Sequence, residues 1–245
     1  MRVTLSEVSK GPNRAALPLT SLEFHTGTVT LARAETERRP TVLGLIASGR
    51  MRPDSGTVTL DGRTDFGAIR SRVALVDAPG VCEPAADVTV AEVVAEELMF
   101  AGRIGHRRAV GRMLAAFDLA DEARSSMADL EPDARIRLLT ELAVLRDEVE
   151  GLVMCSPDRH GGDPLGWWTV ANGLSARGYA VLVIAGDASA HAIASLHPAL
   201  VVTTSDKAVS IAPSAPGAPP AHPEPTRGPA HAHDHDHDHD GADAR

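Results

Sequence analysis

The chain has 245 residues, of which 43% are hydrophobic and only 3% aromatic, and it carries a formal net charge of -9 at pH 7. This length and apolar content allow one large α/β domain, or a domain with an added lobe, whose core is built from Val, Leu, Ile and Ala. The acidic balance argues against broad nucleic-acid binding, because phosphate contacts need a basic face. Two cysteines, Cys82 and Cys155, are too few for a disulfide framework, and we expect both to be reduced core residues.

The N-terminal stretch "MRVTLSEVSK" has no apolar signal region. No apolar run approaches the roughly 20 residues that cross a bilayer. We therefore expect a soluble, cytoplasmic protein that associates with the inner face of the membrane only through a partner.

Alternation of apolar and polar residues predicts strands in the first part of the chain, and near-continuous apolar runs predict buried strands in the second. The predicted strands cover 2–8, 19–24, 27–32, 57–62, 72–77, 151–155 and 179–186, with two short strands within 199–211. Apolar residues at helical spacing predict helices at 40–49, 87–102, 107–118, 132–147, 164–177 and 188–196.

The order of these elements predicts the fold class. The first 75 residues are typical of antiparallel pairing, whereas strand and helix alternate in the second half, which indicates a parallel sheet covered on both faces. Residues 87–130 predict an all-helical lobe, whose first helix begins with Thr89 and Glu92 at capping-box spacing. From residue 212 to 245 the chain has seven prolines and almost no large apolar residues, so we expect one domain over 1–211 and a disordered tail.

Three phrases, at the same order and spacing, resemble segments of the ATP-binding subunits of ABC transporters. They are "RPDSGTVTLDGR" (52–63), "DVTVAEVVAEEL" (87–98) and "GYAVLVIAGD" (178–187), and the resemblance covers about residues 2–211. It implies a P-loop NTPase-like cassette with an N-terminal antiparallel β part, a mainly parallel core sheet and a helical lobe. It also implies Mg-ATP as ligand, an integral-membrane permease as partner, and a dimer with itself or with an active cassette.

The same resemblance places the phosphate-binding loop GxxxxGK[ST] on residues with other chemistry. Its first glycine falls on Ala34, its last on Arg39, its lysine on Pro40 and its hydroxyl on Thr41, while Glu37 replaces a further glycine. A phosphate nest needs successive N–H donors, which proline lacks, and Pro40 also removes the cation that would pair with phosphate. Thr41 could still ligate magnesium, although a hydroxyl at a helix start more often makes a local bond.

Other positions that the family uses for nucleotide chemistry also depart from its pattern. The glutamine that senses metal falls near Ala78, the Walker B aspartate and catalytic glutamate fall on Cys155 and Ser156, and the switch histidine falls on Gly186. The LSGGQ signature becomes "LEPDA" (130–134), whose carboxylates would repel phosphate. We therefore name no catalytic residue, and we predict little or no ATP hydrolysis and at most weak binding of ATP and Mg.

Asp163 in "GGDP" matches the family's D-loop aspartate if one residue is inserted, and a carboxylate in a surface turn is the alternative. Asp187 follows the switch position and is expected to cap the next helix. For Trp167 and Trp168 we favour packing in the core, and the alternative is that one ring packs on the sheet while the other faces a partner.

The tail sequence "HAHDHDHDHD" (231–240) alternates imidazole and carboxylate, a composition that favours binding of Zn, Ni, Cu or Co without selecting one. A solvated tail with adventitious affinity is the alternative. The candidate ligands are His231, His233, His235, His237 and His239.

These observations predict an ABC-type subunit that is ATPase-deficient or binds nucleotide weakly, and that supports a permease or pairs with an active cassette. One alternative is a working transporter ATPase with atypical motifs. Another is a metal-buffering or metal-delivery protein that acts through the His/Asp tail, and a purely structural interaction protein is a third.

Overall fold

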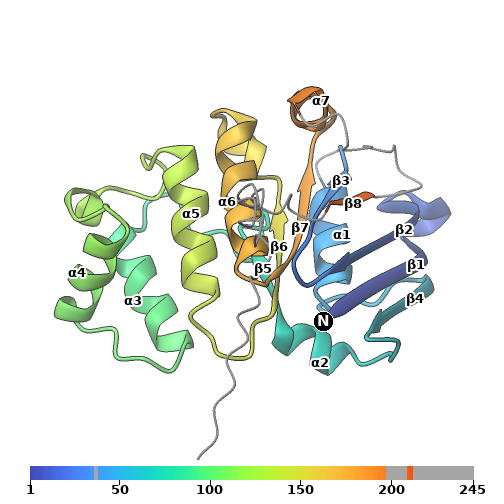
Figure 1. Ribbon diagram of the computed structural model, residues 1–245, viewed down its shortest axis with the longest axis horizontal. Helices are drawn as coiled ribbons and strands as arrows, with labels where there is room; N and C mark the ends of the chain where they lie inside the picture. Colours follow the sequence, from blue (N-terminus) through green and yellow to red (C-terminus); the bar gives the residue numbers. More distant parts are fainter. Residues whose placement is uncertain (36–37, 197–208, 212–245) are drawn as a thin grey trace, which may run out of the picture. The chain divides into compact units, whose positions relative to one another are not determined.

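The computed structural model describes the protein over residues 1–35, 38–196 and 209–211 (Figure 1). These residues lie within one compact unit, Met1–Pro213. No helix in the described ranges is long and apolar enough to span a bilayer. The strands are β1 (Arg2–Lys10), β2 (Leu17–His25), β3 (Val29–Arg33), β4 (Ser55–Leu60), β5 (Val73–Val76), β6 (Gly151–Cys155), β7 (Ala180–Ala185) and β8 (Val209–Ile211).

Helices occupy most of the chain between these strands. The α-helices are α1 (Arg39–Ala47), α2 (Phe66–Arg72), α3 (Val90–Phe100), α4 (Arg107–Ala116), α5 (Pro132–Ala143), α6 (Pro164–Ala176) and α7 (Asp187–Leu196). The short 3-10 helices are η1 (Pro12–Arg14), η2 (Asp121–Arg124) and η3 (Pro157–His160).

Two sheets organise the described residues. β2, β1 and β4 form an antiparallel sheet in that order, and β5, β6, β7, β3 and β8 form a second one. In the second sheet β3, β5, β6 and β7 run parallel, while β8 is antiparallel to β3. This confirms an α/β fold with an antiparallel part and a mainly parallel core. The expectation of an antiparallel first 75 residues is wrong for β3 and β5, because both pair with strands from the second half of the chain.

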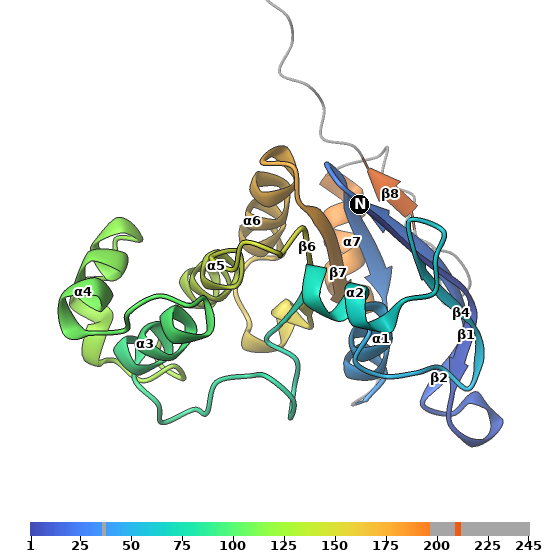
Figure 2. The same cartoon turned by 90° about the horizontal axis from the view of Figure 1, so that it is seen from below.

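Helix α1 lies between the two sheets, as the view in Figure 2 shows. Its buried Leu43 and Ile46 join a core cluster with Val3 and Phe24 of the antiparallel sheet and with residues of β6 and β7. On the opposite face of the parallel sheet, α5 and α6 share a second cluster with α3 and α4. The core therefore consists of two layers of apolar contacts, one on each side of the parallel sheet.

Several predicted elements agree closely with the structure, and a few do not. The strand 151–155 and the capping box of α3 are confirmed, since Thr89 accepts from the amide of Glu92 and the Glu92 carboxylate accepts from the amide of Thr89. Helix α2 was not predicted, because only Ile69 of its seven residues is buried. Trp167 and Trp168 are both buried, which confirms the favoured expectation of core packing. Of the two short strands expected within 199–211, only β8 lies in the described residues.

The capping box of α3 predicts a measurable contribution to stability. Thr89→Ala removes the side-chain acceptor at the helix N-terminus and is expected to lower the free energy of unfolding by about 1 kcal/mol, measured by urea denaturation. Thr169→Ala is the matched control, because Thr169 is exposed within α6 and its hydroxyl donates only to the Leu165 carbonyl one turn earlier. An equal loss in both variants would contradict the capping role.

Candidate functional site

The candidate site is the edge of the parallel sheet where the carboxyl ends of β3, β6 and β7 meet. β3 pairs with β7 from Val29 to Arg33, and β7 pairs with β6 as far as Cys155. The loops that follow these three strands lie side by side, and ligands of open α/β sheets bind at such an edge. These loops carry most of the positions at which the resemblance expects nucleotide chemistry.

Three of the predicted site residues, Arg39, Pro40 and Thr41, lie in the first turn of α1, and a fourth, Ala34, directly follows β3. The amide of Ala34 donates to the Ala185 carbonyl at 3.0 Å, so it extends strand pairing and is not available to a ligand. Pro40 is buried in the first turn and has no N–H. Thr41 follows it and is half-buried, and its hydroxyl makes no hydrogen bond with another described residue. Arg39 is half-buried with its Nε sealed from solvent and without a partner in the described residues. Glu37 lies outside the described residues.

Carboxylates of the chain itself occupy the neighbouring backbone donors. Glu35 Oε1 accepts from the amide of Asp187 at 2.7 Å. Asp158 Oδ2 accepts from the amide of Gly186 at 2.9 Å and from Ser189 Oγ at 3.0 Å. The three loops are thus joined by the chain's own carboxylates, and their negative charge would repel a phosphate.

An ion pair adds a further link between two of these loops. Arg33 Nε lies 2.6 Å from Asp187 Oδ1, and the Arg33 side chain is largely buried. Asp187 begins α7, as expected, but its carboxylate pairs with β3. Sequence reasoning missed Glu35 and Asp158, because neither occupies a position with a defined role in the family's motifs and both act on residues far along the chain.

The carboxyl end of β6 has no carboxylate. Cys155 is buried, and burial raises the pKa of its thiol far above the ordinary value, so the group is neutral at physiological pH. A Cβ at Gly44 of α1 would overlap Cys155 Sγ, and this sulfur lies 3.7 Å from the Pro40 carbonyl. Ser156 has a left-handed backbone, and its amide donates to the Ile184 carbonyl at 2.8 Å. These residues do not fit a magnesium ion, which prefers charged oxygen ligands.

Cys82 departs from its expected place in the core. The residue is exposed as a whole, although its sulfur turns inward and accepts from the amide of Ala78 at 3.4 Å. Burial of this sulfur raises the pKa of the thiol. Ala78 itself, at the position of the family's metal-sensing glutamine, is buried and has no polar side chain.

A cluster of charged side chains lies next to this edge, at the end of β5. The Asp77 carboxylate is 0% exposed, and it receives Arg135 Nη2 at 2.8 Å, Arg159 Nη2 at 3.1 Å and His160 Nε2 at 2.8 Å. Arg159 Nη2 also lies 2.8 Å from Glu83 Oε2. The cluster connects β5, the loop after it, η3 and the first turn of α5. We refer to these five residues as the Asp77 cluster.

The Asp77 cluster determines the protonation state of its central carboxyl group. Burial by itself raises the pKa of Asp77, but the hydrogen bonds from His160 and Arg135, with the charges of Arg159 and Arg135, outweigh it and hold the pKa well below its usual range. Asp77 is therefore ionised throughout the physiological range. No local sequence pattern indicates this cluster, since its members are separated by up to 83 residues.

Asp163 lies apart from the residues at the start of α1. It caps α6, because its Oδ1 accepts from the amide of Leu165 at 2.9 Å. The candidate tail ligands His231, His233, His235, His237 and His239 lie outside the described residues. Within the part of the chain that the structure describes, no group of three His, Cys, Asp or Glu side chains could hold a metal ion.

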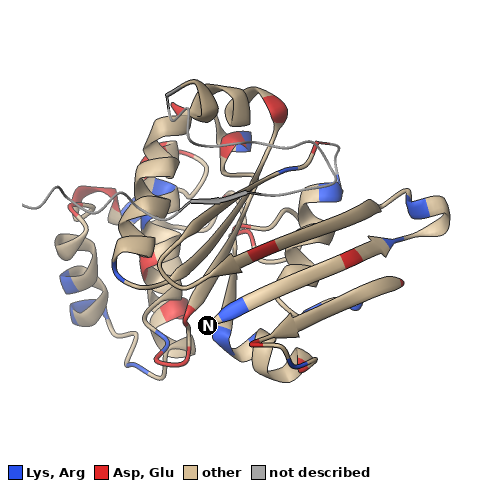
Figure 3. Cartoon of the chain, turned by 45° about the vertical axis from the view of Figure 1, so that its right-hand side comes forward, with Lys and Arg blue, Asp and Glu red and all other residues tan. Residues whose placement is uncertain are grey.

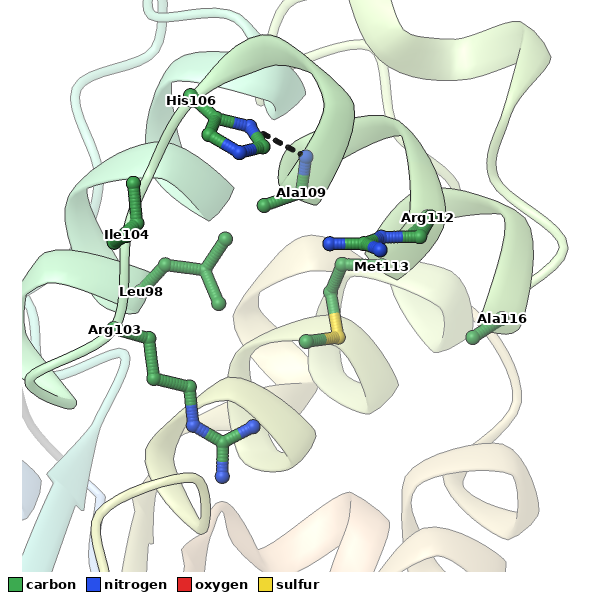
Figure 4. A pocket seen from close by; sticks show the side chains of 8 residues that line it. All are labelled: Leu98, Arg103, Ile104, His106, Ala109, Arg112, Met113 and Ala116. Carbon is green, nitrogen blue, oxygen red and sulfur yellow. Dashed lines mark hydrogen bonds between the residues drawn. The ribbon is translucent and has the colours of Figure 1, made fainter.

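The helical lobe carries a second feature, a hollow between the end of α3 and α4 (Figure 4). Its volume is about 410 Å³, and its walls include Leu98, Arg103, Ile104, Arg112 and Met113. Ile104 is 74% exposed, and Met99 and Phe100 beside it are also exposed. The sequence from 98 to 117 contains four arginines and no acidic residue, and positively charged positions colour α4 in Figure 3. We refer to this surface as the lobe patch.

Comparison with solved structures identifies the fold. The chain is similar to the ATP-binding subunit of an ABC transporter, with 18% identity and a TM-score of 0.53 over 76% of this chain and 80% of that chain. It is similar to a nucleotide-free ATP-binding cassette from an ABC transporter, with 16% identity and a TM-score of 0.57 over 76% and 82%. It is also similar to a dimeric bacterial ABC transporter cassette, with 16% identity and a TM-score of 0.55 over 76% and 88%.

No profile of a known protein family and no curated protein matches the sequence. The chain therefore has the fold of an ABC transporter ATP-binding cassette, which confirms the resemblance at the level of architecture. Identities of this size establish the fold and leave activity to be argued from the site itself.

The Asp77 cluster predicts a specific loss of stability. Asp77→Asn leaves Arg135 and Arg159 without their carboxylate, and we expect the free energy of unfolding at pH 7 to fall by about 3–5 kcal/mol. Because the folded-state pKa of Asp77 is lowered, its contribution is complete above the unfolded-state pKa of about 3.9 and is lost as the pH falls further. The difference between wild type and variant should therefore shrink below about pH 4 in urea denaturation.

Asp87→Asn is the control, since Asp87 is exposed and forms no ion pair with a described residue. This substitution should change stability by less than about 0.5 kcal/mol at any pH in the series. If the difference between wild type and Asp77→Asn stayed constant from pH 7 to pH 3, the carboxylate would not act through its charge.

Proposed function

We propose that this protein is a cassette-shaped subunit of an ABC transporter that does not hydrolyse ATP, and that supports a membrane permease or pairs with an active cassette. The proposal rests on one observation about the loops that follow β3, β6 and β7, which we call the strand-end loops. The chain's own carboxylates, Glu35 and Asp158, accept from the backbone amides there. Two further observations support the proposal independently: Pro40 stands where the family has a lysine, and the buried Cys155 stands where it has a carboxylate.

Electrostatics and hydrogen bonding both oppose a bound triphosphate here. Each lost charge-assisted hydrogen bond to phosphate is worth about 1.5–3 kcal/mol, and Pro40 supplies neither charge nor donor. Phosphate oxygens would have to displace Asp158 from Gly186 and Glu35 from Asp187 while facing those carboxylates. The neutral thiol at Cys155 cannot supply a charged ligand for the metal, and the nearby carboxylates of Glu35 and Asp158 already accept from the amides of Asp187 and Gly186.

The lobe patch supports the part of the proposal that concerns a membrane partner. Met99, Phe100 and Ile104 are exposed at the end of α3 and in the loop after it. Single exposed apolar residues are common on protein surfaces, whereas several close together indicate an interaction site. The arginines around them add positive charge to the surface of an acidic chain. An amphipathic helix of a permease, with apolar and acidic side chains, fits this combination.

Calorimetry with Mg-ATP tests the loss of nucleotide binding. We expect no binding tighter than about millimolar, an affinity of roughly -4 kcal/mol. Thr41→Ala should leave the titration unchanged, because the hydroxyl has no metal to ligate. Stimulated ATP turnover in the presence of a permease, abolished by Thr41→Ala, would instead establish a working ATPase with atypical motifs.

Charge reversal tests the lobe patch. Arg112→Glu should weaken binding to a candidate permease in nanodiscs at least five-fold, because Arg112 lines the hollow and faces the proposed acidic helix. Arg124→Glu is the matched control: Arg124 is also exposed but does not line the hollow. Equal affinities for the two variants, measured by surface plasmon resonance, would place the permease contact elsewhere.

A further inference from the structure

A polar cavity lies at the C-terminal end of α1, opposite Pro40. None of the residues that line it belongs to the strand-end loops. Helix α1 ends in a Schellman motif: Gly49 has φ +72°, its amide donates to the Ile46 carbonyl at 3.1 Å, and the amide of Arg50 donates to the Leu45 carbonyl at 2.8 Å. A Cβ at Gly49 would lie 2.9 Å from Ile69 Cβ. The end of α1 therefore rests directly on α2, as Figure 2 also shows, and this close approach fixes where Arg50 emerges.

The cavity beside this contact has a volume of about 500 Å³, which suits a small ligand. Its walls come from the turn after α1, from the two residues before α2, and from α2 itself. The cavity contains three arginines, one carboxylate and one aromatic ring. These are Arg50, Arg52, Arg70, Asp65 and Phe66.

None of the three guanidinium groups lies within ion-pair distance of a carboxylate in the described ranges. Arg50 is half-buried, and its Nη1 donates to the carbonyls of Ser48 at 3.0 Å and Val73 at 2.9 Å, which are neutral acceptors. The Arg52 guanidinium lies 5.2 Å from the centroid of the Phe66 ring. Arg70 is exposed at the rim. A half-buried cation without a counter-ion is unfavourable, so an anion that enters here would be stabilised.

The electrostatic state of Arg50 agrees with this description. Burial lowers the pKa of its guanidinium, Cys82 opposes that effect, and the positive charges of Arg146 and Arg70 lower the pKa further. Arg50 and Arg70 line the same cavity, and their positive charges repel one another. A shared anion would remove this repulsion.

The negative groups near the cavity are already engaged. Asp65 Oδ1 accepts from the amide of Ala68 at 2.9 Å and so caps α2. The Leu45 carbonyl at the end of α1 receives the amides of Arg50 and Met51 at 2.8 and 3.0 Å. Asp65 keeps its negative charge when it caps α2, but the three arginines outnumber it, so the cavity carries a net positive charge.

We propose that this cavity binds a small phosphorylated anion, held by Arg50, Arg52 and Arg70. Arg50 is held by its two carbonyl contacts and supplies a fixed cation at the inner wall. Arg52 and Arg70 close on the phosphate from the rim, where a planar guanidinium can donate two parallel hydrogen bonds to its oxygens. The ligand class is a phosphate ester or pyrophosphate group, whether it belongs to a free metabolite or to a lipid headgroup.

Calorimetry with inorganic pyrophosphate, in the absence of magnesium and at low salt, tests the proposal on the full chain. We expect a Kd below about 1 mM for the wild type, corresponding to more than roughly 4 kcal/mol. Arg52→Gln and Arg70→Gln should each weaken binding at least five-fold, and the double variant should show no binding. Both side chains are exposed, so the variants are expected to fold, and circular dichroism checks this.

Arg124→Gln is the matched control and should bind as the wild type does. Flotation with phosphatidylcholine vesicles, with and without phosphatidic acid, identifies the source of the phosphate: binding that depends on both phosphatidic acid and Arg52 supports a lipid headgroup, and pyrophosphate binding alone supports a soluble ligand. Pyrophosphate affinity that is equal in the wild type and the double variant, or absent from the wild type, would overturn the proposal. Affinity lost in Arg39→Gln but kept in the double variant would also overturn it, and would count against the proposed loss of phosphate binding at the start of α1.

Discussion

A single buried carboxylate, that of Asp77, connects the parallel sheet to the helices beside it. It receives hydrogen bonds from side chains of α5 and η3, and no part of it reaches solvent. A charge buried this deeply is tolerated only when its partners are in place, so the elements that carry Arg135, Arg159 and His160 must dock together. Arg159 extends the connection to Glu83 in the loop after β5. The relative position of β5, its following loop, η3 and α5 is therefore set by electrostatics as well as by apolar packing.

The same principle accounts for the strand-end loops. In a nucleotide-binding site, backbone donors at such an edge are left for phosphate oxygens, and a metal ion balances the charge. Here Glu35 and Asp158 accept from the donors at the start of α7, and Arg33 balances Asp187. The chain thus satisfies these donors with its own side chains. A cassette fold can keep its strands and loops in place without nucleotide when its own side chains replace those contacts.

Sequence reasoning succeeded where a local pattern determines structure, and failed where distant residues meet. The apolar run 151–155 and the capping box at Thr89 were predicted correctly, because periodicity and helix capping depend on neighbours. The sheet to which β3 belongs was predicted wrongly, because its partner β7 lies about 150 residues further along the chain. The absence of lysine at Pro40 and of a carboxylate at Cys155 was visible in the sequence. The role of the Glu35 and Asp158 carboxylates in joining the loops was not visible in the sequence. Neither residue has a defined role in the family's motifs, and both act through tertiary contacts.

The two ends of helix α1 differ in their chemistry toward anions. At its first turn, Pro40 removes a donor and a cation, and α1 packs so closely on β6 that Gly44 leaves no space beside Cys155. At its last turn, Gly49 brings the helix against α2 and exposes three arginines to one cavity without a carboxylate partner among the described residues. Close packing of one helix at both ends is therefore consistent with closure of one anion site and formation of another. Arg39 also lies without a partner among the described residues at the first turn, but only the last turn gathers three arginines around one cavity, and that gathering favours phosphate there.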